Sequence, residues 1–177
     1  MKRRNAIRNM IIIAGGVAIV PSCLTPTDKA SISLHKITIT TRQEQLLAAI
    51  ASAIIPRTDT PGAGEVGAHL FVLKMLDDCY EKEDQEKFIS GLNQLENSTK
   101  KRFGSSFIKC TSAQKETVLK EVENKSGYSR DIVDFYKIMK EKTIQGFLTS
   151  KYVVLNIQKY ELIPSVPYNG YAPVKNT

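Results

Sequence analysis

The sequence predicts an all-α protein: a single bundle of about five helices, preceded by an N-terminal signal and tether and followed by an extended C-terminal tail. Three observations favour this class. Apolar residues recur at helical spacing in five successive segments. Short connections carrying proline or glycine separate these segments, and two of the segments open on a capping-box pattern. With 177 residues, 42% hydrophobic and 24% charged, the chain has the size and composition of one folded domain.

The first 22 residues have the layout of an export signal, with a basic start and a short apolar stretch before Cys23. Arg3 and Arg4 resemble the twin-arginine pattern, which directs the export of folded proteins; an ordinary secretory signal is the alternative. Val20-Pro21-Ser22-Cys23 resembles the lipobox of bacterial lipoproteins, and an unmodified cysteine is the alternative. The apolar stretch is too short for a helix that spans a bilayer. We therefore expect an exported protein on the periplasmic side, anchored in the membrane by a lipid on Cys23.

Residues 23–40 are expected to form a polar tether that ends in a short extended segment with alternating apolar residues. The helical domain is expected over 41–177, with the extended tail over 161–177. Thr41 and Glu44 fit a capping box that opens the first helix, and Pro56 ends this helix.

Further helices are predicted over about 65–80 and 82–103, then from a capping box at 111–114, and finally from Ser129 to about 147. The residues expected to face the core are Leu46, Leu47, Ile50, Ile54, Ile55, Phe71, Met75, Leu76, Cys79, Phe88, Leu92, Leu95, Phe103, Val118, Leu119, Val122, Ile132, Phe135, Tyr136, Met139 and Phe147. Short connections between such helices favour a bundle.

The segment "TPGAGEVG" at 60–67 matches the G-x-G-x-x-G spacing of a dinucleotide-binding turn. That turn functions between a β-strand and a helix, whereas the preceding "LLAAIASAII" has helical character. No alternation of strands and helices follows to build a parallel sheet. We therefore interpret the match as a turn and expect no cofactor site in this chain.

Charge excludes a nucleic-acid role. The formal net charge of +7 includes four basic residues of the export signal; without them 21 basic and 18 acidic residues remain, a net charge of +3. Lysines alternate with glutamates, as on a solvated surface. The acids Asp77, Asp78, Glu81, Glu83 and Asp84 are interpreted as a charged, solvent-facing helix junction rather than a catalytic pair.

No catalytic or metal-binding set stands out in the sequence. His35 and His69 lie far apart and have no acid or cysteine at ligand spacing; His35 is expected to be exposed, and His69 to be a hydrogen-bonded residue at a helix start. Cys79 and Cys110 form either a disulfide or two buried free thiols.

Two segments are candidates for a partner interface. Residues Arg57-Thr58-Asp59-Thr60 lie in a polar loop between two prolines, which reduce the cost of ordering the loop on binding. The alternative is a self-contained loop, in which Arg57 pairs with Asp59. The tail "ELIPSVPYNGYAPVKNT" favours an extended strip in which Tyr168 and Tyr171 anchor to another surface; packing along its own bundle is the alternative.

The stretch "AIIPRTDTPGAGEVGAHLFV", together with "DDCY", "FISGL" and "KTIQGFLTSKY", resembles the gluconate 2-dehydrogenase subunit 3 family. The resemblance extends over residues 41 to 174. It implies a non-catalytic small subunit that supports a large flavin-dependent (FAD) subunit of the glucose-methanol-choline type. A c-type cytochrome subunit often accompanies such complexes. The competing hypothesis is a stand-alone lipoprotein that binds a small ligand or a surface polymer in a pocket lined by aromatic residues.

Overall fold

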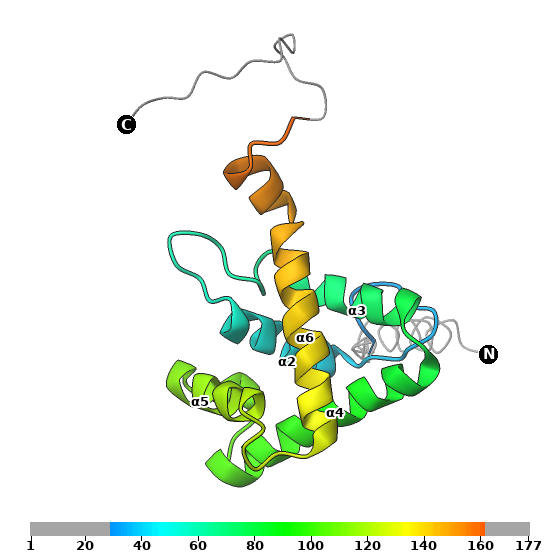
Figure 1. Ribbon diagram of the computed structural model, residues 1–177, viewed down its shortest axis with the longest axis vertical. Helices are drawn as coiled ribbons and strands as arrows, with labels where there is room; N and C mark the ends of the chain where they lie inside the picture. Colours follow the sequence, from blue (N-terminus) through cyan, green and yellow to red (C-terminus); the bar gives the residue numbers. More distant parts are fainter. Residues whose placement is uncertain (1–28, 162–177) are drawn as a thin grey trace, which may run out of the picture.

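The computed structural model describes residues 29–161 (Figure 1). Five α-helices follow one another: α2 (Thr41–Ile54), α3 (Ala68–Cys79), α4 (Lys82–Phe103), α5 (Ser112–Glu123) and α6 (Arg130–Leu148). A 3₁₀ turn η1 (Phe107–Lys109) lies between α4 and α5, and a π-helical turn η2 (Val153–Ile157) follows α6. Residues 29–161 contain no strand, so the predicted all-α class is confirmed. The signal residues Arg3 and Arg4, Cys23, and the tail tyrosines Tyr168 and Tyr171 lie outside the described residues.

Helix α6 stands at the centre of the bundle and contacts α2, α3, α4 and α5 (Figure 1). Its closest partner is α4, where the rings of Phe88 and Phe135 meet edge to face with centroids 4.7 Å apart. Gly91 lets the two helices approach, because a Cβ at this position would lie 2.4 Å from the Cβ of Phe135. The core therefore depends on a close crossing of α4 and α6.

The helix starts follow the sequence signals with one correction. Thr111 and Gln114 form the expected capping box of α5, and Ser129 caps α6. For α2 the N-cap is Thr40, one residue before the predicted Thr41, and its capping-box partner is Gln43. The reason is that Glu44 accepts hydrogen bonds from Ser31 instead, and is not available to the cap.

The predicted core faces are confirmed for α5 and for most of α2, α4 and α6; for α3 only Leu76 is confirmed. Phe71 and Met75 are half-buried and Cys79 is exposed, whereas the buried face of α3 is formed by Ala68, His69, Val72, Leu73, Leu76 and Asp77. The prediction used hydrophobicity alone, so it placed the polar residues of this face, His69 and Asp77, outside the core. The predicted buried face of α3 is therefore turned about the helix axis relative to the observed one. Ile54, Ile55, Phe103 and Phe147 are half-buried at the margin of the core.

The glycines of the 60–67 segment serve backbone packing. A Cβ at Gly62 would lie 2.9 Å from the carbonyl oxygen of Ile55, and one at Gly64 would lie 2.9 Å from that of Ala48. Gly67 adopts a left-handed conformation (φ 75°) as the N-cap residue of α3. A turn that packs closely on the end of α2 thus takes the place of a phosphate-binding loop.

The arm, residues 29–40, has no regular secondary structure but is not a free tether. Ile37 and Ile39 are buried, and Ile32 and Leu34 are half-buried, as the predicted alternation requires. The backbone N–H of Ala30 donates to Ile39 (2.9 Å). The described part of the predicted tether is therefore packed on the helical core.

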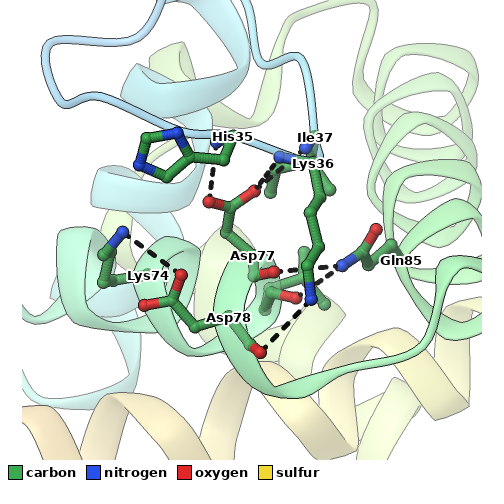
Figure 2. A network of polar contacts seen from close by, with 8 residues as sticks. His35, Lys36, Ile37, Lys74, Asp77, Asp78 and Gln85 are labelled. Atoms are coloured by element: carbon green, nitrogen blue, oxygen red, sulfur yellow. Dashed lines mark hydrogen bonds and ion pairs between the residues drawn. The ribbon is translucent and has the colours of Figure 1, made fainter.

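A buried carboxylate holds the arm (Figure 2). Asp77 on α3 is fully buried and accepts backbone hydrogen bonds from His35 (2.8 Å), Lys36 (2.7 Å) and Ile37 (3.0 Å). Burial alone raises the pKa of Asp77, but the three N–H donors outweigh it and the pKa is lowered from its ordinary value. The prediction of a solvated cluster is right for the other four acids, which are exposed, and wrong for Asp77.

The end of α3 is closed by a second buried side chain. Gln85 on α4 donates its Nε2 to the carbonyl oxygens of Leu76 (3.0 Å) and Tyr80 (2.9 Å). Leu76 lies in the last turn of α3 and Tyr80 is its C-cap residue, where no further helical N–H groups satisfy the carbonyls. Asp77 and Gln85 together join the arm, α3 and α4 into one unit (Figure 2).

Candidate partner-docking surface

The large apolar side chains that the described residues expose gather at one end of the molecule. They are Ile144 (38% exposed), Leu148 (51%), Leu155 (50%), Ile157 (54%) and Tyr160 (55%). We call this set the apolar end. It covers the last turns of α6 and the η2 turn, which extend beyond the rest of the bundle (Figure 1). Exposed apolar side chains gathered at one end make this region the candidate for contact with another molecule.

The apolar end results from the way α6 leaves the core. Gly146 is its last buried residue and packs against the Phe71 side chain of α3. Ile144 and Leu148 lie off the buried stripe and meet no neighbouring helix that covers them. The apolar residues at this end of the chain gave no sign in the sequence of where they would lie.

Local hydrogen bonds fix the backbone of the apolar end. In η2 the N–H of Gln158 donates to the carbonyl of Val153 (2.9 Å), and that of Tyr160 donates to Val154 (3.0 Å). Val153 is buried against the bundle, and Lys159, just after η2, has a left-handed backbone with φ 51°. The exposed side chains are thus presented by an ordered turn.

The loop predicted as an interface is exposed and ordered. Arg57, Thr58 and Asp59 are exposed and Thr60 is half-buried. The N–H of Thr58 donates to the carbonyl of Thr60 (3.0 Å), and Arg57 pairs with Glu65 at 2.9 Å. The self-contained alternative therefore holds for the contacts of Arg57, although its partner is Glu65 rather than Asp59.

The loop is connected to the C-terminal part of α6 through α3. The loop leads through Gly67 into α3, whose Phe71 packs on Gly146 of α6, and Figure 1 shows it projecting from the bundle at the level of the C-terminal half of α6. Together the two regions offer a charged, ordered loop and an apolar patch. The tail tyrosines predicted as anchors lie outside the described residues.

The two histidines lie in different settings in the described part of the chain. His35 is exposed on the arm, and His69 is buried at the start of α3. Burial lowers the pKa of His69, with an opposing contribution from the charge of Glu44. The Nδ1 of His69 has no hydrogen-bond partner, contrary to the expected bond. Within residues 29–161 no group of three or more His, Cys, Asp or Glu side chains is placed to hold a metal ion.

Cys79 and Cys110 are free thiols in the structure. The structure contains no disulfide between them, in agreement with the second predicted alternative. That alternative expected both thiols to be buried, but Cys79 is exposed and only Cys110 is buried. Burial raises the pKa of the Cys110 thiol. A raised pKa keeps the Cys110 thiol protonated, and so does not favour nucleophilic chemistry at this cysteine.

Among the helices described, none combines the length and the apolar character needed to cross a membrane.

Comparison with known proteins gives one match: the family model described as gluconate 2-dehydrogenase subunit 3 covers residues 41–165. No curated protein and no solved structure matches the chain. The matched region includes every described helix from α2 to η2 and both parts of the docking surface. Because the match spans most of the sequence, the chain belongs to the gluconate 2-dehydrogenase subunit 3 family.

Proposed function

We propose that this chain is a non-catalytic small subunit of a flavin-dependent sugar or sugar-acid dehydrogenase, and that the apolar end docks on the large subunit. The observation that carries the proposal is the ordered apolar surface at the end of α6, within a chain whose family is named for one subunit of an enzyme. Ordered apolar side chains bind a partner at low entropic cost.

The loop at 57–60 supplies the polar margin of the proposed interface. Its contacts are internal, so Arg57, Thr58 and Asp59 are displayed without a large loss of freedom on binding. Protein interfaces combine an apolar centre with a polar rim, and the apolar end and this loop match those two roles.

The N-terminal sequence supports an exported, anchored complex. A large subunit that binds FAD in the cytoplasm needs a route for folded cargo, and Arg3 and Arg4 suit the twin-arginine route. Acylation of Cys23 attaches the complex to the membrane on the periplasmic side. A c-type cytochrome subunit is the proposed electron acceptor where one is present.

The test is co-purification from native membranes, read as the flavin absorbance that accompanies the tagged small subunit. We expect wild type to retain a large flavoprotein, and the double variant Leu148→Asp/Leu155→Asp to lose it, because two carboxylates would be buried unpaired in the interface.

The matched control is Thr38→Asp/Asn97→Asp, which adds the same charge at exposed positions on the arm and on α4. This control is expected to retain the flavoprotein. A wild-type chain that leaves native membranes as a stable monomer, with no flavoprotein attached, contradicts the proposal.

A further inference from the structure

A groove of about 350 Å³ runs between the end of α5 and the middle of α6. Its apolar lining comes from Val122, Val133 and Ile144, and its rim carries Lys125, Lys137 and Lys140. This volume lies in the range of small-molecule sites, which pair an apolar lining with a few polar groups.

Tyr136 supplies a polar group inside the groove. Its side chain lines the groove and is only 6% exposed, and its hydroxyl bonds to no residue in the described part of the chain. Burial raises the pKa of Tyr136 to about 12, with a smaller contribution from Glu123, so the hydroxyl stays protonated and remains a hydrogen-bond donor. A donor in this place favours a ligand atom that accepts.

The charges around the groove leave an excess of cations. Glu123 pairs with Lys140, and Glu141 pairs with Lys142 at 3.0 Å. Lys125 and Lys137 are left without an ion pair among residues 29–161. The groove therefore presents two free ammonium groups and one phenolic donor beside an apolar lining.

Lys125 occupies a backbone conformation that glycine usually takes. Its φ is 55°, in the left-handed region that costs a side chain about 1 kcal/mol or more. Lys125 directly follows the C-cap of α5, and the N–H groups of Lys125 and Ser126 donate to the carbonyls of Val122 (3.0 Å) and Glu121 (2.9 Å), the hydrogen-bond pattern that ends many helices. The end of α5 therefore fixes the backbone from which the Lys125 side chain reaches the rim of the groove.

We infer that the groove binds an amphiphilic carboxylate, the class that includes medium- and long-chain fatty acids. Tyr136 donates a hydrogen bond to the carboxylate, Lys125 and Lys137 neutralise its charge, and Val122, Val133 and Ile144 contact the alkyl chain. All of these residues belong to this chain, and only Ile144 is shared with the apolar end.

The binding test titrates the purified full chain with dodecanoate, dodecanol and dodecyltrimethylammonium, each below its micellar concentration, by isothermal calorimetry. Saturable binding of dodecanoate is expected, with dodecanol about ten-fold weaker because it lacks the charge, and the cation weaker still. Absence of saturable dodecanoate binding, or equal binding of all three amphiphiles, overturns the inference.

Variants separate the site from the fold. Tyr136→Phe and Lys137→Ala are each expected to weaken dodecanoate binding about five-fold or more, and Lys101→Ala, an exposed lysine of α4, is the matched control with unchanged affinity. Lys125→Gly relieves the backbone strain, so it is expected to keep or raise the melting temperature while it weakens binding. Unchanged affinity in both Tyr136→Phe and Lys125→Gly overturns the inference.

Discussion

The arm and the apolar end both extend from the helical core, but they differ in how their apolar side chains are covered. The arm buries Ile37 and Ile39 and satisfies its backbone through Asp77, so its interactions lie within this chain. The apolar end satisfies its backbone within η2 and leaves Leu148 and Leu155 in solvent. We therefore expect substitutions at the arm to change stability, and substitutions at the apolar end to change the proposed binding of a partner.

Asp77→Ala is expected to lower the free energy of unfolding more than the other substitutions, and it tests whether the arm is needed for stability. Three buried or half-buried N–H groups of the arm lose their acceptor, and each unsatisfied group costs about 1 kcal/mol or more. We expect the free energy of unfolding to fall by about 3 kcal/mol in urea denaturation. A loss below about 1 kcal/mol would show that the arm does not depend on this carboxylate.

The stabilisation by Asp77 also depends on pH. Its pKa in the folded state lies below the ordinary value of 3.8, so its contribution is complete above that value and is lost as the pH falls through the folded pKa. The difference in unfolding free energy between wild type and Asp77→Asn should be constant near neutral pH and shrink below pH 3.8. A difference that grows on acidification contradicts the assigned role.

Gly91→Ala tests the α4–α6 crossing of the helical core, from which both the arm and the apolar end extend. The added Cβ would lie 2.4 Å from the Cβ of Phe135 and 2.5 Å from the carbonyl oxygen of Asp131, so α4 and α6 must separate. Such overpacking costs about 2 kcal/mol. Gly104→Ala is the control: it meets no neighbour within 4 Å and bears only the cost of φ 65°, about 1 kcal/mol. Thermal melting of both variants checks the order.

Leu155→Ser tests whether the apolar end acts in binding a partner rather than in stabilising this chain. Because Leu155 is 50% exposed, its replacement should change the free energy of unfolding by no more than about 0.5 kcal/mol. The same variant should reduce the flavoprotein retained in the co-purification. A large loss of stability without the partner would place Leu155 in the core of this chain instead.

Arg57→Ala is expected to have the smallest effect on stability. The pair with Glu65 is exposed, with 75% and 44% of the two side chains accessible, and such pairs contribute about 0–1 kcal/mol. We expect no measurable change in the melting temperature and a weaker association with the large subunit. If association is also unchanged, the loop is not part of the interface.

The sequence was sufficient for the helices whose signals are local. Thr111 with Gln114, Ser129 and Pro56 each act through neighbouring backbone groups, and α4 begins and ends where the pattern predicts. Asp77 could not be identified in this way, because its three donors lie about 40 residues earlier in the chain. A buried carboxylate and a surface carboxylate look alike in sequence, and only tertiary contacts distinguish them.

The candidate site was predicted in part. The loop at 57–60 was recognisable because its prolines and glycines reveal a rigid turn. The apolar end was missed, since Leu148, Leu155 and Ile157 resemble core residues until the neighbouring helices are seen to leave them uncovered. Exposure of this kind depends on how far α6 extends past its partners, which no local pattern encodes.

Under the proposed acylation of Cys23, the carboxylate that holds the arm would also limit the distance between the domain and the lipid. Lys29, whose carbonyl accepts a hydrogen bond from Thr41, is six residues from the proposed acylated Cys23, a leash of about 20 Å when fully stretched. A domain of this size has a radius of gyration of about 14 Å. The subunit would therefore lie within roughly its own width of the bilayer. A dehydrogenase subunit bound at the apolar end would then work close to the membrane surface.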